Sequence, residues 1–315
     1  MSFRSSSPSF RRAVITGASS GIGAAFARAL PSRTALLLTG RDAAALEELA
    51  GELRGAGGRE VRVVTADLTE ASGRAELIAA ASAFAPDLLI NDAGLGTWGA
   101  FLEDPQARME ATVLVNALAP VALTRALLPE MIERAEIEHR RCGLLNVAST
   151  LAFVPVPYGA VYGASKAFLL SFTEALAAEL AGRPVDVLAV CPGPVRTAFF
   201  RRAGMPGGAP FGAQDPNEVA RRALAELGRR TVTFTDLPSA TLLWPIADMR
   251  VGLSRIVALG LGVVRHFAGR RAPEPETGET PVAEPPAKAP RPPLGAAEPE
   301  VPGTQPKRRR GKPAQ

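Results

Sequence analysis

Tyr162 and Lys166 are the residues whose types and spacing point most directly to chemistry. They are four positions apart, so on a helix both side chains lie on one face, one turn apart. An unperturbed tyrosine titrates at about pH 10 and is a poor proton carrier at neutral pH, but a neighbouring ammonium group favours the phenolate and lowers its pKa. The pair therefore predicts a general acid/base, Tyr162, tuned by Lys166. Because solvated helix surfaces also show Tyr-x-x-x-Lys, the surroundings of the pair must decide.

A glycine-rich turn supplies a second signal. Gly17, Gly21 and Gly23 lie between an apolar run and the helical pattern Ala24–Leu30. Glycines allow a tight turn and a close approach of the backbone to a pyrophosphate, which the amino end of a helix attracts. In this strand–turn–helix context the turn predicts a dinucleotide-binding site.

The few histidines and cysteines argue against other chemistries. Residues 17–21 also fit the GxSxG nucleophile elbow of hydrolases, but neither His139 nor His266 lies in a loop pattern that would complete a catalytic triad. Neither histidine belongs to a metal-ligand pattern such as HExxH, so we expect no metal site. Cys142 and Cys191 are far apart and form no CxxC pattern, so we expect two buried, reduced cysteines.

Short apolar strands alternate with longer helical patterns over residues 12–235. Most of the apolar runs lack period-two alternation, as expected when helices cover both faces of a sheet. The alternation predicts an α/β fold with a single Rossmann-type, doubly wound parallel sheet of about seven strands. The expected strands are Ala13–Thr16, Thr34–Thr39, Val61–Thr65, Leu88–Asn91, Gly143–Ala148, Val185–Val190 and Thr231–Thr235.

The end of the second expected strand bears on cofactor choice. Folds that prefer NAD place an acid there for the ribose 2′-hydroxyl, whereas a nearby arginine accommodates a 2′-phosphate. Here the strand ends in Gly40-Arg41, and Arg41 offers a forked cation suited to phosphate. Asp42 is expected to cap the helix that begins at Ala43. The sequence therefore favours NADP(H) over NAD(H).

Seven motifs in order along residues 12–235 resemble the classical short-chain dehydrogenase/reductase family. Each motif alone is modest, whereas the ordered set is specific. The matching segments are Thr16–Gly23, Asp67-Leu68, Asn91-Asp92-Ala93-Gly94, Asn116, Ser149, Tyr162-Gly-Ala-Ser-Lys166 and Cys191-Pro-Gly-Pro-Val-Arg-Thr197.

The resemblance implies a catalytic set of Asn116, Ser149, Tyr162 and Lys166. Tyr162 would be the acid/base, and Lys166 would lower its pKa and hold the nicotinamide ribose. Ser149 would bond the substrate oxygen, and Asn116 would hold a water in a proton relay through Lys166. Ser149 also ends an expected strand, where ligands of such sheets bind.

The resemblance also implies a cofactor site. Asp67 would bond the adenine with Leu68 behind it, and Val195 and Thr197 would contact the nicotinamide end. The residues expected to bind the cofactor are Gly17, Ser19, Ser20, Gly21, Ile22, Gly23, Arg41, Asp67, Leu68, Asn91, Asp92, Ala93, Gly94, Tyr162, Lys166, Val195 and Thr197.

One motif departs from the family pattern, because Asp92 replaces the usual second asparagine of Asn-Asn-Ala-Gly. That position normally ties down the central strands beside the cofactor. An ionised Asp92 accepts hydrogen bonds but cannot donate them, and it places a negative charge near the cofactor.

The chain divides into four expected segments: an N-terminal extension (1–11), the NAD(P)-binding catalytic domain (12–237), a hydrophobic helical segment (238–271) and a disordered tail (272–315). The tail holds 12 of the 28 prolines and ends in a basic cluster at residues 307–312. The hydrophobic segment is expected to pack over the substrate cleft or at a subunit contact. The alternative is an interfacial helix that makes peripheral membrane contact through residues 238–268, anchored by Trp244 and arginines.

Charge and the N-terminal sequence bear on partners and location. The net charge of +5 is modest and diffuse, so we expect no nucleic-acid partner. Residues 1–12 do not read as a signal peptide, so we expect a cytoplasmic protein, with membrane association through 238–268 as the alternative. The resemblance also implies a homodimer as a candidate assembly, formed through the two long helices expected at about 107–138 and 158–181.

The substrate is expected to be a small carbonyl or alcohol compound, apolar or bulky. Phe199 and Phe200 fall in residues 198–213, where the family places a mobile substrate lid, and Phe153 and Trp98 are further candidate pocket walls. The leading hypothesis is therefore an NADP(H)-dependent oxidoreductase that interconverts a carbonyl and an alcohol. The second hypothesis is a non-catalytic NADP(H)-binding sensor or a membrane-associated scaffold with the same fold.

Overall fold

The computed structural model describes residues 10–55, 58–205, 208–210 and 212–267. The expected N-terminal extension, apart from its last residues, and the expected tail 272–315 with its basic cluster lie outside the described residues.

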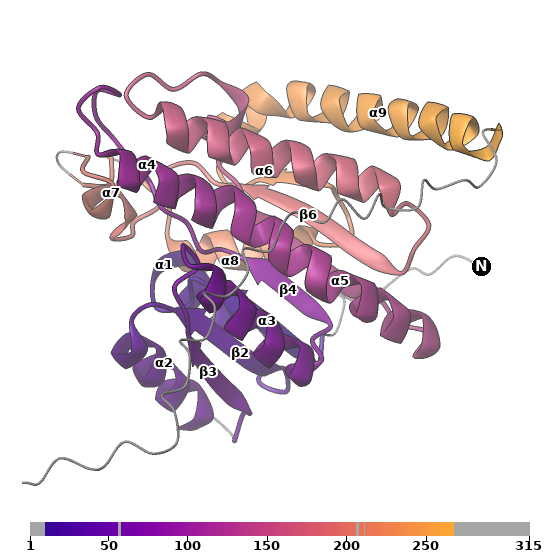
Figure 1. Ribbon diagram of the computed structural model, residues 1–315, viewed down its shortest axis with the longest axis horizontal. Coiled ribbons are helices and arrows are strands. Elements are labelled where there is room, and N and C mark those ends of the chain that lie inside the picture. The colour runs from indigo at the N-terminus through magenta and orange to yellow at the C-terminus, as the bar shows by residue number, and fades with distance from the viewer. Residues whose placement is uncertain (1–9, 56–57, 206–207, 211, 268–315) are drawn as a thin grey trace, which may run out of the picture. The chain divides into compact units, whose positions relative to one another are not determined.

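Seven parallel strands form one sheet in the order β3-β2-β1-β4-β5-β6-β7 (Figure 1). The order reverses between β1 and β4, which is the point where doubly wound sheets bind ligands. All seven expected strands are confirmed, with ends that shift by at most one residue. Their bounds are β1 Arg12–Thr16, β2 Ala35–Gly40, β3 Val61–Thr65, β4 Leu88–Asn91, β5 Cys142–Val147, β6 Val185–Cys191 and β7 Val232–Phe234.

Helices cover both faces of the sheet, which explains why the strands are almost uniformly apolar. One buried cluster joins the sheet to α1, α2 and α8, and a second joins it to α3, α5 and α6. The bounds are α1 Gly21–Ala29, α2 Ala43–Gly55, α3 Ala71–Phe84, α4 Gln106–Val113, α5 Ala119–Ile137, α6 Ala160–Glu179, α7 Phe199–Arg202, α8 Pro216–Glu226 and α9 Leu237–Phe267. A π-helical turn, Leu114–Leu118, joins α4 to α5, and a 3-10 turn spans Thr150–Phe153.

The continuous helical run Gln106–Ile137 is apolar and long enough to cross a membrane by length and composition. However, 56% of its most apolar window is buried inside the fold. Its apolar character is therefore accounted for by packing: Leu123, Leu127 and Met131 belong to the core cluster on that face of the sheet.

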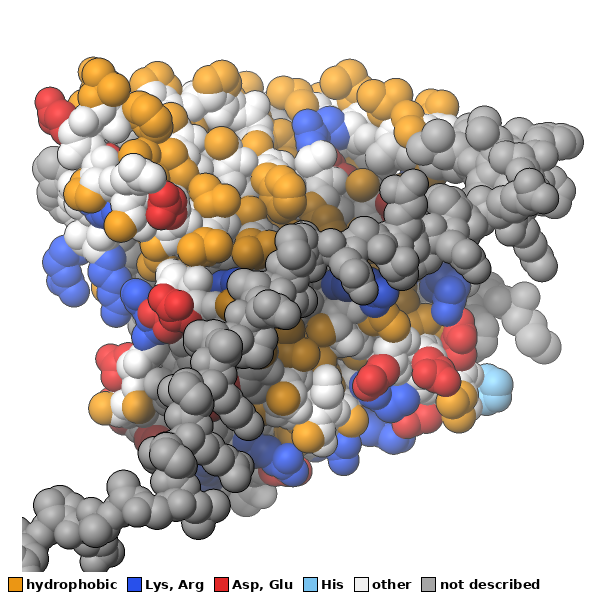
Figure 2. Space-filling model, in the orientation of Figure 1, with side chains coloured by type: hydrophobic (Ala, Val, Ile, Leu, Met, Phe, Trp, Pro, Cys, Tyr) orange, Lys and Arg blue, Asp and Glu red, His pale blue; other side chains and the backbone are white. Residues whose placement is uncertain are grey.

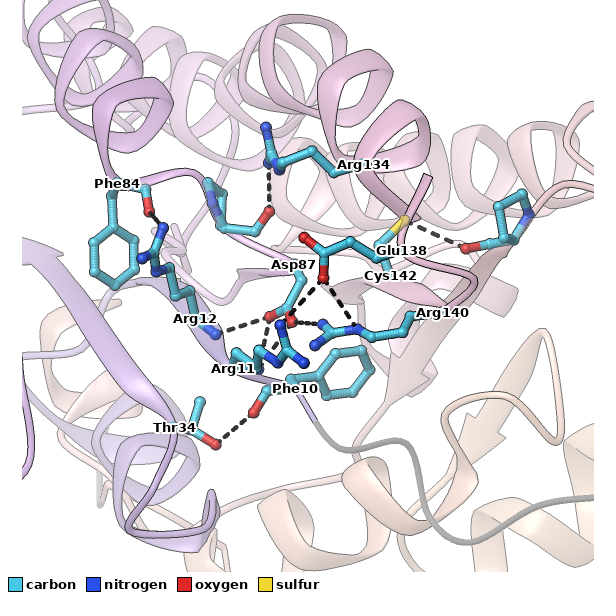
Figure 3. Close-up of polar contacts among 12 residues, drawn as sticks. Phe10, Arg11, Arg12, Thr34, Phe84, Asp87, Arg134, Glu138, Arg140 and Cys142 are labelled. Atoms are coloured by element: carbon cyan, nitrogen blue, oxygen red, sulfur yellow. Dashed lines mark hydrogen bonds and ion pairs between the residues drawn. The ribbon is translucent and has the colours of Figure 1, made fainter. Parts of the chain in front are cut away.

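An ionic network at the amino ends of β1 and β4 is centred on Asp87 (Figure 3). Its carboxylate accepts hydrogen bonds from the backbone N–H groups of Arg11 (2.9 and 3.0 Å) and Arg12 (2.8 Å) and pairs with Arg140. Glu138 pairs with Arg11 and Arg140 from the end of α5. The network joins the start of the fold to the segment between α5 and β5, and sequence reasoning did not predict it.

Helix α9 packs on α6 and β7, next to α6 in Figure 1. Arg250 makes a bidentate ion pair with Glu174 of α6 (2.7 to 3.2 Å), and Glu174 is buried. Trp244 lies edge-on against Phe234 of β7, and the Arg230 guanidinium lies 4.6 Å from its ring centroid. The Trp244 ring thus packs against the fold, while membrane contact through this segment stays a prediction.

Candidate active site

Several residues that carry candidate chemistry lie at the carboxyl edge of the sheet, near the reversal of strand order. Ser149 follows β5, while Tyr162 and Lys166 lie in the first two turns of α6. Ser149 adopts an extended backbone that begins the 3-10 turn, and its Oγ accepts a hydrogen bond from the Leu151 N–H (3.1 Å). That bond uses the hydroxyl as an acceptor, so its own proton remains available to a second partner.

Tyr162 is a protonated phenol in this arrangement. Burial raises the pKa of Tyr162 to about 12, a hydrogen bond with the Ser149 side chain lowers it, and the Asp92 charge raises it further. From the sequence we expect Lys166 to lower the pKa of Tyr162. In the protein without cofactor the pKa of Tyr162 is raised instead, because the loss of solvation outweighs the contribution of neighbouring groups.

Lys166 is held rigidly beside Tyr162. Its Nζ donates to the Val147 carbonyl at the end of β5 (2.7 Å) and lies 6.0 Å from the centroid of the Tyr162 ring. Burial lowers the pKa of Lys166 to about 8, and the Asp92 charge raises it. The predicted helical spacing thus does bring the two side chains together on one face of α6.

Asn116 lies in the π-helical turn between α4 and α5, and π turns often occur at functional positions. Its side chain donates to the Leu95 carbonyl and to the Ser165 Oγ, and its Oδ1 accepts from the Leu95 N–H, at 2.8 to 2.9 Å. A β-carbon added at Gly94 would lie 3.4 Å from Lys166 Nζ and 3.5 Å from Asn116 Oδ1. The Asn116 side chain thus lies close to Lys166, but its hydrogen bonds go to neighbouring loop and helix groups.

The glycine turn fits a dinucleotide pyrophosphate. Gly17 has a φ of +71°, and a β-carbon there would lie 2.8 Å from the Ala93 Cα. A β-carbon at Gly23 would lie 2.5 Å from the Gly17 carbonyl oxygen, so only glycine allows the turn to close. The amino end of α1 has no side-chain cap from Ser20 and no acidic residue in its first turn. A helix start of this kind attracts an anion.

The adenosine end of the expected cofactor site holds one charged pair. Arg41 follows β2, and its guanidinium lies 3.8 Å from Asp67 Oδ2, with both side chains substantially exposed. Asp67 Oδ1 accepts hydrogen bonds from the N–H and hydroxyl of Thr69 (2.9 and 2.8 Å), and Leu68 is buried beside it. Asp42 accepts from the Ala45 N–H (3.0 Å), which confirms its predicted capping role.

The segment Asn91–Gly94 is tied down by residues that sequence reasoning mostly missed. Asn91 Nδ2 donates to Asn146 Oδ1 on β5 (2.8 Å), and Asn146 donates to the Thr173 hydroxyl on α6 (2.9 Å). The Thr16 hydroxyl accepts from the N–H groups of residues 92 and 93, both at 3.0 Å. The only signal in the sequence was a polar residue, Asn146, within an otherwise apolar strand.

Asp92 does not tie the central strands together. Its carboxylate lies under the glycine turn, where it accepts a hydrogen bond from the Gly23 N–H and faces the charge of Lys166. Burial raises the pKa of Asp92 to about 7, whereas Lys166 and the Gly23 bond lower it. Loss of solvation therefore favours the protonated form of this carboxyl group, and Lys166 opposes it.

A short segment after β6 lies over the site. Val195 is buried and pairs with Gln214, and Thr197 packs against Gly21 of the glycine turn. Phe199, the first residue of α7, lies on Tyr162 with ring centroids 5.3 Å apart.

The other candidate pocket walls have different neighbours. Phe200 meets Phe199 edge-on, with centroids 5.8 Å apart. Trp98 packs against Gly159, just before α6. Phe153 packs on Phe234 of β7, so its ring is shared with the cluster under α9.

Comparisons with known proteins agree with this geometry. The family model "short chain dehydrogenase" matches residues 11–205. Dehydrogenase/reductase SDR family member 7B of Mus musculus is 33% identical over 225 residues, which cover 69% of this chain and 67% of that protein. A solved short-chain dehydrogenase from Sphingobium yanoikuyae in complex with NADPH is 31% identical, with a TM-score of 0.70 over 77% of this chain and 94% of that one. A bulky-bulky ketone specific alcohol dehydrogenase from Comamonas testosteroni is 30% identical, with a TM-score of 0.64 over 78% and 94%.

Proposed function

The chain belongs to the short-chain dehydrogenase family, as an NAD(P)-dependent oxidoreductase that acts on CH–OH groups, and we propose that it interconverts a bulky, apolar ketone and its alcohol with NADP(H). The observation that carries the proposal is the convergence of Ser149, Tyr162 and Lys166 beside the glycine turn at one edge of the sheet. A hydroxyl, a phenol and an ammonium group at that place can bind, protonate and stabilise the oxygen of a reduced carbonyl.

The proposed mechanism assigns one task to each side chain. The cofactor, when bound, supplies or accepts a hydride at its nicotinamide ring. Ser149, oriented by the Leu151 N–H, donates a hydrogen bond to the carbonyl oxygen. Tyr162, protonated at neutral pH, gives that oxygen its proton. The Lys166 ammonium stabilises the phenolate that remains, because an opposite charge nearby favours the ionised form.

The residues that would hold the cofactor are those of the glycine turn, of Asn91–Gly94 and of the β2 end. A dinucleotide would place its pyrophosphate at the start of α1, where Ser20 provides no side-chain cap. Its 2′-phosphate would contact the guanidinium of Arg41. The Arg41 side chain is 59% exposed, and its ion-pair partner, Asp67, is 3.8 Å away. A pair so exposed contributes little, so the guanidinium is available to a phosphate.

Replacing Arg41 tests the proposed preference for NADP(H). Arg41→Asp places a carboxylate where the 2′-phosphate would lie, and repulsion in place of a bidentate contact is expected to weaken NADPH binding by roughly a hundredfold. NADH lacks that phosphate, so its affinity should change by less than about threefold. Dissociation constants from cofactor fluorescence measure both. An unchanged ratio of the two affinities would show that Arg41 does not select the phosphate.

The proposed substrate class is supported by Phe199, whose ring lies against Tyr162, and by Phe200, whose ring meets that of Phe199. It is supported further by the similarity to an alcohol dehydrogenase whose described preference is for bulky-bulky ketones. A screen of NADPH oxidation with diaryl and alkyl–aryl ketones, against small polar aldehydes and sugars, tests it. Faster turnover of the polar carbonyls would contradict the apolar class. Tight NADPH binding without turnover of any carbonyl would support the non-catalytic sensor instead.

A further inference from the structure

Helix α9 is apolar on two opposite faces. The inner face is fixed to the fold, since Ala240, Leu243 and Ala247 are buried against the β7 cluster and Arg250 is paired with Glu174. The opposite face carries six apolar side chains that are between 41% and 74% exposed, and we call them the outer stripe: Leu242, Ile246, Met249, Leu253, Ile256 and Val257. Figure 2 shows hydrophobic side chains along the edge of the molecule where α9 lies.

The outer stripe has the spacing of a helix-pairing surface. From Leu242 to Ile256 the steps are alternately four and three residues, the repeat by which two helices keep one seam in contact. None of its six members is charged or polar. Soluble proteins seldom leave such a contiguous apolar face in water.

We propose that the outer stripe is a dimer interface whose occupant is the outer stripe of a second copy of this chain, packed antiparallel. A two-fold axis near residue 251 places Met249 opposite the partner's Leu253 and Ile246 opposite the partner's Ile256. Antiparallel packing also aligns opposite ends of the two helix dipoles.

The size of the stripe fits this occupant. Its exposed parts equal roughly three to four complete side chains, and burial removes on the order of 100 Å² of apolar surface for each. A pair of stripes therefore buries on the order of 700 Å² of apolar surface. Because about two thirds of a homodimer interface is apolar, that corresponds to roughly 1,100 Å² in total, which exceeds the roughly 1,000 Å² expected of a biological interface.

The surroundings of the stripe fit a lipid surface less well. An interfacial helix presents cationic and aromatic side chains at the border of its apolar face. In α9 the aromatic candidate, Trp244, is turned against Phe234, and Arg250 is paired with buried Glu174, which leaves Arg255 as the one exposed arginine of residues 237–259. The described part of the helix thus directs these two groups toward the fold.

Sedimentation velocity of the full chain across micromolar concentrations tests the proposal with two charge-matched variants. The wild type is expected to be dimeric. Met249→Lys with Leu253→Lys sets like charges opposite each other and is expected to raise the dissociation constant by roughly a hundredfold or more. Met249→Lys with Leu253→Glu sets opposite charges across an antiparallel pair and should bind roughly tenfold more tightly than the Lys/Lys variant.

Leu102→Lys is the matched control, because Leu102 is an exposed apolar residue before α4 and lies outside α5, α6 and α9. It should leave the dimer intact, and circular dichroism should show that every variant keeps its helices. A monomeric wild type, or a Lys/Lys variant that dimerises like the wild type, would overturn the proposal. Equal weakening in both double variants would overturn the antiparallel arrangement. A monomeric wild type that co-sediments with phosphatidylserine vesicles, and loses this with the Lys/Glu variant, would assign the stripe to membranes.

Discussion

Asp92 places a partly buried carboxylate between the glycine turn and Lys166. It receives the Gly23 N–H, and its charge raises the pKa of Lys166 and that of Tyr162. Asparagine would keep an acceptor for Gly23 but would remove the charge. The protonation of Asp92 is therefore coupled to that of Tyr162 and Lys166, the proposed catalytic pair.

This coupling predicts a pH-dependent difference between the wild type and Asp92→Asn. The folded-state pKa of Asp92, about 7, lies above its ordinary value of 3.8. Protonated Asp92 thus contributes stability that is present at low pH and is lost as the pH rises toward the folded-state pKa. Between pH 5 and pH 8 the unfolding free energy of the wild type should fall relative to Asp92→Asn by roughly 1–3 kcal/mol. Urea titrations at several pH values measure this, and parallel pH profiles would contradict it.

At the scale of single residues, the sequence predicted which side chains share a helix face but not how buried those side chains are. Four-residue spacing sufficed to place Tyr162 and Lys166 on one helix face. It could not give the raised pKa of Tyr162, because burial arises from segments distant in sequence, including the α7 residue Phe199. The hydrogen bonds of Asn116 to Leu95 and Ser165 likewise depend on tertiary contacts.

At the element scale, the Arg250–Glu174 ion pair fixes α9 to α6. Glu174 is almost fully buried and receives three hydrogen bonds from one guanidinium. Removal of one partner leaves a buried charge without compensation, which is strongly destabilising.

Arg250→Ala is therefore expected to lower the unfolding free energy by roughly 3 kcal/mol. Arg255→Ala is the control, because Arg255 is an exposed arginine on the same helix, and its replacement should cost less than about 1 kcal/mol. Chemical denaturation compares the two variants. Equal effects would show that the ion pair does not anchor α9.

Strands were more predictable than the C-terminal helix. Most strands are largely apolar, since both faces of the sheet are covered, and the ends of these apolar runs gave the strand ends to within one residue. Helix α9 is apolar on two faces, so periodicity could not say which face packs on the fold. For the same reason the sequence could not predict that Trp244 lies against Phe234.

At the scale of the whole molecule, the two edges of the sheet have different tasks. The carboxyl edge gathers the candidate catalytic and cofactor residues, whereas the amino edge carries the ionic network around Asp87. The doubly wound topology could be predicted from the strand–helix alternation. The network could not, because it joins residues that are more than 50 positions apart.

Asp87→Ala tests whether the amino edge of the sheet contributes to stability without affecting turnover at the carboxyl edge. It leaves the N–H groups of Arg11 and Arg12 and the Arg140 guanidinium without their acceptor, so stability should fall by roughly 2–4 kcal/mol. Turnover measured well below the melting temperature should change less than about twofold. Glu138→Ala, at an exposed partner of the same arginines, should cost less than about 1 kcal/mol. A large loss of turnover in Asp87→Ala would show that the edges are coupled.

The claim that Tyr162 delivers the proton is tested most directly by Tyr162→Phe, which removes one hydroxyl and keeps the ring packed against Phe199. The rate of NADPH oxidation with a ketone that the wild type reduces should fall by roughly a thousandfold, because general acid catalysis is lost. The NADPH dissociation constant should stay within about threefold, because the glycine turn and Lys166 are intact. Near wild-type turnover by Tyr162→Phe would contradict the account.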